Sequence, residues 1–270
     1  MIEKFITYLI SIRGYSKNTA YAYESDVRQF ARWMREHDQN ARWSTTTRDE
    51  IDMYIIEQQH RGLKPASTNR QLAAISSLYK YMKREGYAID NPTKYESRRK
   101  IGERIPNTIP IQDITMAYHH ATGAAKFMIG LLTTTGMRIS EMLSLTWEDI
   151  NFTTGVIKIT GKGNKQRIVT TDPKILEPIA QCKQNGKSSG KMFGIDDRTA
   201  RYMIWQALKP YSNAQQLSPH AIRHSVATHM AKTGHNVAKI ATLLGHKSIK
   251  TTQQYIDMAQ AAETRTCVQL

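Results

Sequence analysis

The sequence has few cysteines and no long apolar run. Its two cysteines, Cys182 and Cys267, are too few and too far apart for a disulfide framework or a cysteine metal site. No apolar stretch approaches the length of a membrane-spanning helix. Glu3 and Lys4 interrupt the first apolar stretch, which excludes a secretory signal. We therefore expect a cytoplasmic protein without a membrane partner.

Acidic residues are scarce relative to basic ones. The 270 residues contain 23 Asp and Glu against 38 Lys and Arg, a net charge of +15. Both residues 1–100 and residues 101–270 carry part of this excess. Nucleic acid is the expected partner, because Lys and Arg release condensed counterions from phosphates. A membrane surface, or solubility alone, is the competing explanation. Basic charge in both parts favours two modules that grip one DNA duplex.

The first hundred residues are predicted to be helical throughout. Ser16 and Thr47 are suitable N-caps for two helices, Pro65 is suited to the start of a third, and Gly62 and Gly86 are expected to end the last two. The predicted inward faces contain Tyr23, Val27, Phe30, Met34, Ile51, Tyr54, Ile55, Leu72, Ile75, Leu78, Tyr79 and Met82.

Arginine and lysine occupy the opposite faces of these helices. For any one of them a solvated surface is the simpler explanation, but their combined charge favours contact with DNA. The candidate DNA-binding residues here are Arg28, Arg32, Arg70 and Lys80.

Residues 91–110 interrupt the helical pattern with Pro92, Pro106 and Pro110. We place a domain boundary near residue 104. The predicted organisation is a helical DNA-binding domain over 1–100, a linker over 101–108 and a second domain over 109–270.

The second domain is predicted to be mixed but mostly helical. Val156–Ile159 and Arg167–Thr170 flank a glycine-rich turn and predict a β-hairpin. The fold class is therefore mainly α, with an all-helical N-terminal domain and a small hairpin or sheet in the second. Four further helices are expected over 197–208, 219–233, 236–244 and 248–260.

Five polar residues in the second domain suit the chemistry of a phosphodiester: Arg138, His220, Arg223, His246 and Tyr255. The transition state of phosphoryl transfer gathers negative charge on its oxygens, and arginines can stabilise that charge in place of metal ions. The sequence has no convincing carboxylate cluster for a two-metal site, so we expect no metal and no other cofactor.

Each of these residues also has an ordinary structural explanation. Arg138 would suit the surface of an amphipathic helix, His246 a helix–helix turn, and Tyr255 a packing position. His220 and His224 have the i, i+4 spacing of a zinc pair. Ala221 stands where a zinc protease needs glutamate, which argues against that metal site.

Taken together, the segments resemble the tyrosine recombinase (phage integrase) family, and most closely its Xer-type members. The matching segments are Thr-Gly-Met-Arg-Ile-Ser-Glu-Met-Leu-Ser-Leu at 135–145, Thr-Gly-Lys-Gly-Asn-Lys-Gln-Arg at 160–167, Ser-Pro-His-Ala-Ile-Arg-His-Ser-Val-Ala-Thr-His at 218–229, Leu-Leu-Gly-His at 243–246 and Thr-Thr-Gln-Gln-Tyr at 251–255. The region from Gly14 onward resembles the core-DNA-binding domain of that family.

The resemblance implies a role for each residue. Tyr255 would be the nucleophile that forms a 3′-phosphotyrosine, and Arg138 and Arg223 would clamp the phosphate. His220 would act in proton transfer at the tyrosine, and His246 would hydrogen-bond a phosphate oxygen. Lys162 matches the general acid, which protonates the departing 5′ oxygen. Two nearby lysines, Lys165 and Lys158, remain alternatives for that role, and Lys165 is also a candidate DNA contact.

The resemblance further implies a homotetramer on two double-stranded DNA sites, in which the segment after the tyrosine docks into a neighbour. The phosphotyrosine conserves the bond energy, so no ATP is expected. A type IB topoisomerase and a non-catalytic DNA-binding regulator are the alternatives. Chromosome-dimer resolution, plasmid resolution and mobile-element integration stay open, as does the need for an accessory activating protein.

Overall fold

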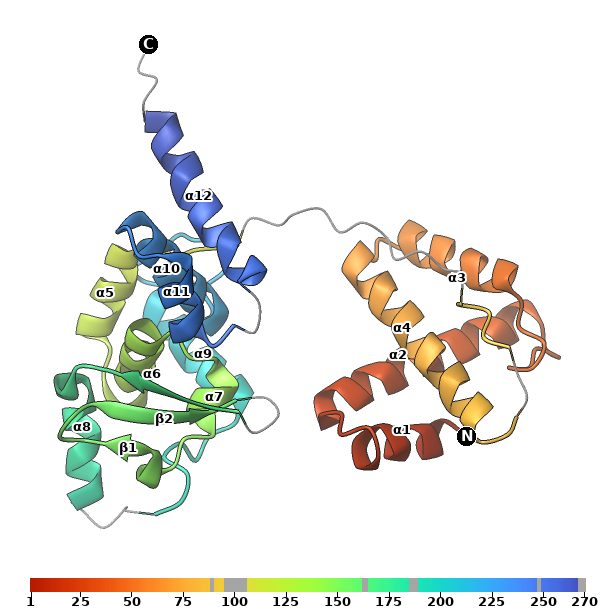
Figure 1. The fold of residues 1–270 in the computed structure, drawn as a ribbon, viewed down its shortest axis with the longest axis horizontal. Helices are drawn as coiled ribbons and strands as arrows, with labels where there is room; N and C mark the ends of the chain where they lie inside the picture. Colours follow the sequence, from red (N-terminus) through yellow and green to blue (C-terminus); the bar gives the residue numbers. More distant parts are fainter. Residues whose placement is uncertain (88–89, 95–105, 162–164, 185–188, 247–248, 267–270) are drawn as a thin grey trace. The chain divides into compact units, whose positions relative to one another are not determined.

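The computed structural model describes residues 1–87, 90–94, 106–161, 165–184, 189–246 and 249–266. The chain divides into two compact units, Met1–Glu103 and Arg104–Leu270 (Figure 1). Its described part is mostly α-helical and contains one small antiparallel sheet, so the predicted fold class is confirmed. No helix in this part is both long and apolar enough to cross a bilayer. The predicted linker over 101–108 lies largely outside the described residues.

Four helices form the N-terminal unit, and local signals define where they start. They are α1 (Ile2–Ser11), α2 (Lys17–His37), α3 (Arg48–His60) and α4 (Pro65–Arg84). Ser16 Oγ accepts a hydrogen bond from the Thr19 amide, and Thr47 forms a reciprocal capping box with Glu50. Such caps satisfy amides that the helix itself leaves unpaired, and each stabilises a helix by about 1 kcal/mol. The predicted starts of α2, α3 and α4 are confirmed.

The core of this unit contains the predicted apolar faces. Eleven of the twelve predicted side chains are buried, and Tyr23 is half-buried. Phe5 and Leu9 of α1, which the sequence analysis did not single out, complete one side of the core. Phe30 packs its ring against Trp33, Trp43 and Tyr54 at centroid distances of 4.9–5.9 Å.

The C-terminal unit is built around one helix that is apolar on every side. Phe127 to Leu132 of α6 (Gly123–Thr135) are six consecutive buried residues. Helices with apolar residues all round belong in the centre of a fold. Accordingly α6 packs against α5 (Ile111–His120), α8 (Pro173–Gln184), α9 (Asp197–Leu208) and α10 (Pro219–Lys232).

A three-stranded antiparallel sheet lies in the same unit, with strand order β1–β2–β3. β2 (Val156–Thr160) and β3 (Gln166–Thr170) pair with Ile157 opposite Val169, and the predicted hairpin is confirmed with each strand one residue longer. β1 (Ile150–Asn151) was not predicted, because two residues are too few to show a strand pattern. The sheet places Arg167 at the second residue of β3.

The last helices carry most of the candidate site. α9 and α11 (Val237–Leu244) match the predicted ranges, with Asn236 as the N-cap of α11, and α10 ends one residue earlier than predicted. The prediction that the last helix ends near residue 260 was wrong, since α12 runs over Lys250–Thr266. No glycine or proline occurs in this stretch to stop the helix. Its C-terminal part extends beyond α10 and α11 (Figure 1).

Candidate active site

Arg138 lies where α6 ends and a short helix, α7 (Ile139–Leu143), begins. Gly136 ends α6 in the left-handed region at φ 57°, and a Cβ there would lie 2.9 Å from Leu244 Cδ2 of α11. Glycine is therefore required both by conformation and by the close approach of α11. Arg138 follows as the N-cap of α7, with its side chain 41% exposed.

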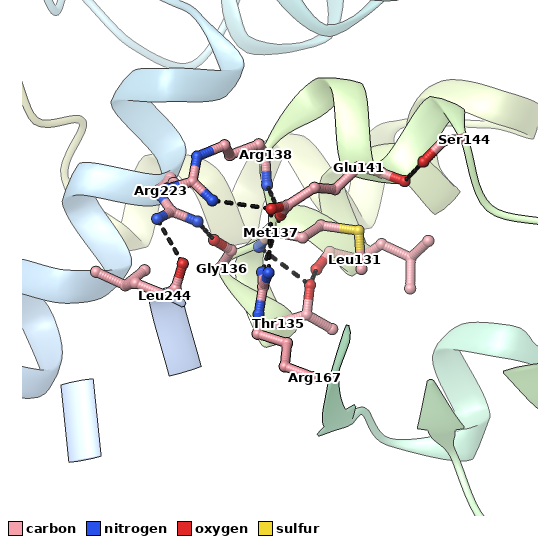
Figure 2. Close-up of polar contacts among 10 residues, drawn as sticks. All are labelled: Leu131, Thr135, Gly136, Met137, Arg138, Glu141, Ser144, Arg167, Arg223 and Leu244. Atoms are coloured by element: carbon pink, nitrogen blue, oxygen red, sulfur yellow. Dashed lines mark hydrogen bonds and ion pairs between the residues drawn. The ribbon is translucent and has the colours of Figure 1, made fainter. Parts of the chain in front are cut away.

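Arg223 of α10 is the most buried cation of the site. It is 2% exposed, and its guanidinium donates hydrogen bonds to the carbonyl oxygens of Gly136 and Leu244 (Figure 2). Burial, and next the nearby charge of Arg138, lower its pKa to about 10, so Arg223 stays protonated at neutral pH. Because its two acceptors end α6 and α11, this side chain ties three helices together at one point.

A buried carboxylate, Glu141 of α7, joins two arginines. It accepts hydrogen bonds from Arg138 Nη1 at 2.8 Å and from both terminal nitrogens of Arg167 at 2.9 and 3.0 Å (Figure 2). Burial alone would raise the pKa of Glu141, but these hydrogen bonds outweigh it and hold the pKa at about 2. Glu141 is therefore ionised at neutral pH.

His246 follows a second left-handed glycine. Gly245 has φ 63° and ends α11, and a Cβ there would lie 2.9 Å from Arg167 Nη1. His246 Nδ1 lies 2.8 Å from Thr252 Oγ1 of α12. Burial, then the charge of Arg223, lowers the pKa of His246 to about 4, which leaves a neutral ring at pH 7.

Tyr255 of α12 is buried against two histidines. It is 1% exposed, its hydroxyl lies 2.6 Å from His224 Nδ1, and its ring stacks on His246 at a centroid distance of 6.4 Å. Burial raises the pKa of Tyr255 and lowers that of His224 to about 4. A neutral His224 can accept the phenolic proton in this hydrogen bond.

His220 stands in the first turn of α10, behind the Ser218 cap and Pro219. Its ring lies 4.6 Å from that of His224, one turn along the same helix. Burial, then the charge of Arg223, lowers the pKa of His220. His224, rather than His220, is the hydrogen-bond partner of the Tyr255 hydroxyl.

An open cleft adjoins this cluster. It is lined by Arg138, Ser140, Glu141, Thr160, Gly161, Lys165, Gln166, Arg167, Gly245, His246 and Thr251. Lys165, a predicted DNA contact, lies on this cleft, while Lys162 lies outside the described residues. Lys158 points elsewhere, since its Nζ lies 3.6 Å from Asp149. In the described part of the chain no group of three or more His, Cys, Asp or Glu side chains could hold a metal ion.

The four predicted DNA contacts of the N-terminal unit lie on α2 and α4 in different settings. Arg70 forms a two-pronged bond with buried Asp26 at 2.8 and 2.9 Å. Arg28 pairs with Glu24 one turn earlier at 2.7 Å. Arg32 is exposed, and Lys80 lines a pocket with Arg13 and several tyrosines.

Three residues of the cluster had no assigned role in the sequence analysis: Glu141, Arg167 and His224. Glu141 stands three residues after Arg138, so an i, i+3 pair could have been read from the sequence. His224 was considered only as a metal partner of His220. The contact between Arg167 and Glu141 spans 26 residues and leaves no local pattern.

Known proteins with similar sequences point to the same type of active site. Residues 111–262 match the Phage integrase family, and residues 2–86 match the Phage integrase, N-terminal SAM-like domain. The tyrosine recombinase XerD of Haemophilus influenzae is 30% identical over 282 residues, covering 96% of this chain and 94% of its own length. XerD of Vibrio cholerae is also 30% identical, covering 96% and 92%.

Solved structures show the same fold at lower identity. The XerH site-specific recombinase bound to palindromic difH substrate in a post-cleavage complex aligns with a TM-score of 0.76 at 17% identity, covering 99% of this chain and 84% of the other. A lambda integrase dimer bound to a COC' core site aligns with a TM-score of 0.71 at 19% identity, covering 94% and 75%. The chain therefore belongs to the phage integrase family, as an Xer-type tyrosine recombinase.

Proposed function

We propose that this protein cleaves and rejoins duplex DNA at a specific site through a covalent bond to Tyr255. The observation that carries the proposal is the meeting of Arg138, Arg223, His246 and Tyr255 where α6, α10, α11 and α12 come together. The family and its XerD relatives support the same activity. Arg138 and Arg223 would hold the scissile phosphate, with His246 as a further hydrogen-bond donor.

The chemical step transfers a phosphoryl group from DNA to the tyrosine. The Tyr255 oxygen forms a bond to phosphorus, and the bond from phosphorus to the 5′ oxygen breaks. The phenolic proton passes to the imidazole pair of His220 and His224, of which His224 already contacts the hydroxyl. The departing 5′ oxygen takes a proton from the hairpin lysine, for which Lys162 is the first candidate and Lys165 the second. Attack by another 5′ hydroxyl on the phosphotyrosine reverses these steps, so the exchange needs no ATP.

Access of Tyr255 to DNA requires a change in α12. At 1% exposure the Tyr255 side chain is covered in this structure, and a shift of α12, which carries it, would bring the hydroxyl to a DNA phosphate. The C-terminal part of α12 extends beyond α10 and α11 (Figure 1). Docking of this segment into a neighbour would couple cleavage to assembly. Truncation at Ala259 should then preserve DNA binding and abolish synapsis, and unchanged recombination would exclude the coupling.

The partners follow from charge and family. Both units are basic, so both are expected to contact double-stranded DNA, with four protomers assembled on two sites. Arg28, Arg32 and Lys80 are the N-terminal contacts that this proposal favours, whereas Arg70 is engaged by Asp26. The protein would act in the cytoplasm on the nucleoid, with or without an accessory activating protein.

The direct test is trapping of the covalent intermediate. Wild-type protein and Tyr255→Phe would be incubated with nicked duplexes tiled from the DNA that flanks the gene, and denaturing gels would be examined for a protein–DNA adduct. An adduct formed by wild type alone establishes the nucleophile and reveals the cleavage site. Binding without any adduct would instead favour a DNA-binding regulator. Relaxation of plasmids that lack the site would favour a topoisomerase.

A further inference from the structure

The carboxylate of Glu141 accepts four hydrogen bonds, two from each of two arginines. The backbone amide and Nη1 of Arg138 donate at 2.8 Å each, and the two terminal nitrogens of Arg167 donate at 3.0 and 2.9 Å (Figure 2). Each carboxylate oxygen therefore receives one bond from each arginine. Glu141 itself is 5% exposed, so little water competes for its charge.

The number of arginines decides the net charge of the cluster. Arg138 alone with Glu141 would form a neutral pair, because a buried carboxylate binds the nearest cation strongly. With Arg167 present the three groups carry one net positive charge. Arg138 is 41% exposed and Arg167 is 17% exposed, so the surplus charge is presented to the cleft mainly by Arg138.

The position of Arg167 is not fully favourable for its own side chain. Among the residues that the structure describes, its buried Nε has no hydrogen-bond partner, and an unpaired buried donor is destabilising. It fits beneath the turn before His246 only because Gly245 has no Cβ, which would lie 2.9 Å from Nη1 and 3.0 Å from Cζ. The hydrogen bonds of Arg167 to Glu141 are therefore the contacts that its position serves.

We propose that Arg167 is a positioning residue that engages Glu141 and so leaves the charge of Arg138 for a DNA phosphate. The inference rests on the proposed function, because it assumes that Arg138 binds the scissile phosphate. Through Arg167, the strand β3 is hydrogen-bonded to Glu141 of α7. Without Arg167, Glu141 would draw Arg138 into a neutral pair and the phosphate would lose one of its two cations.

The test compares single-turnover formation of the covalent adduct at saturating DNA, using the full-length protein and the cleavage site found with wild type. Arg167→Met should slow cleavage by about 10²-fold, the usual effect of losing one electrostatic contact in a transition state. DNA affinity should change little, since Arg167 is mostly buried. Arg167→Lys, which preserves the charge, should recover most of the rate. Lys209→Met is the control, because Lys209 lies over the Trp205 ring at the end of α9.

The decisive variant is the double substitution Arg167→Met with Glu141→Gln. Removal of the carboxylate frees Arg138 again, so the double variant should cleave at least ~10-fold faster than Arg167→Met alone, a partial return of that one electrostatic contact. If Arg167 only braces the fold, the double variant will be as slow as the single one while both stay folded by circular dichroism. That result, or an Arg167→Met rate equal to wild type, overturns the inference. Absence of any adduct with wild type would instead count against the proposed function.

Discussion

Each unit contains a buried carboxylate held by arginine, and the two clusters differ by one cation. In the N-terminal unit, Asp26 and Arg70 form a single two-pronged pair with no net charge. In the C-terminal unit, Glu141 is shared by Arg138 and Arg167, and Arg223 lies nearby with its guanidinium hydrogen-bonded to two carbonyl oxygens. The first arrangement balances a buried charge, while the second accumulates positive charge where a phosphate would bind. The surplus of arginine distinguishes a site from a structural ion pair.

Of the changes considered, removal of Arg223 should have the largest effect on DNA cleavage. Arg223→Met should lower the rate of adduct formation by about 10³-fold, because a preorganised cation at the phosphate is lost. The free energy of unfolding should change by no more than about 2 kcal/mol, since the loss of hydrogen bonds and the removal of a buried charge oppose each other. Single-turnover cleavage and urea denaturation measure the two effects. A rate within tenfold of wild type would place the phosphate elsewhere.

The loss of stability of the C-terminal unit at acid pH should depend on the cluster of Glu141, Arg138 and Arg167. The folded pKa of Glu141 is about 2, below its ordinary value of 4.5, so its contribution is complete above pH 4.5 and is lost as pH falls toward 2. This shift corresponds to about 3 kcal/mol. Glu141→Gln should therefore flatten the loss of stability between pH 5 and pH 2, measured on the C-terminal unit by hydrogen exchange. If Glu141→Gln loses stability with falling pH in the same way as wild type, other carboxyl groups are responsible for that loss.

The neutral pair of the N-terminal unit should matter for stability and little for chemistry. Arg70→Met leaves the Asp26 carboxylate buried without its partner, which should cost about 2 kcal/mol given that Arg70 itself is half-exposed. Amide exchange should accelerate in α2 and α4 but not in α10. The cleavage rate at saturating DNA should stay near that of wild type. Weaker DNA binding without loss of protection would instead show that Arg70 contacts DNA directly.

Most of the fold could be predicted because its signals are local. The caps at Ser16, Thr47 and Asn236 and the apolar faces of α2 to α4 are set by neighbours within one or two turns. The end of α12 was misplaced because no glycine or proline marks it, and β1 is too short for a pattern. Local chemistry therefore defines most elements, and errors occur where an element ends without a stop signal or is too short to show a pattern.

The sequence identified candidate site residues, but it did not show the contacts between them. Arg138, His220, Arg223, His246 and Tyr255 were chosen for their chemistry and by family resemblance, and the structure gathers them. The hydrogen bond from Tyr255 to His224 and the contact of Arg167 with Glu141 arise from helix and strand packing across 31 and 26 residues. The requirement for glycine at position 245 also depends on a distant contact. A Cβ there would be too close to Arg167, which is far away in the sequence.

The smallest expected effect on stability concerns the exposed ion pair of Arg28 and Glu24. It has the same chemical groups as the buried arginine–carboxylate pairs but lies in water. Arg28 lies 2.7 Å from Glu24 on α2, with side-chain exposures of 50% and 25%. Water screens such a pair, so Arg28→Met should change the free energy of unfolding by less than about 0.5 kcal/mol. If Arg28 contacts a DNA phosphate, the slope of log affinity against log salt should fall by about 1. Glu24→Gln is the matched control and should raise affinity slightly by freeing Arg28. An unchanged salt slope in Arg28→Met would mean that Arg28 stays paired with Glu24 when DNA binds. Arg28 and Glu24 would then form a neutral structural pair on the surface of α2, comparable to that of Arg70 with the buried Asp26.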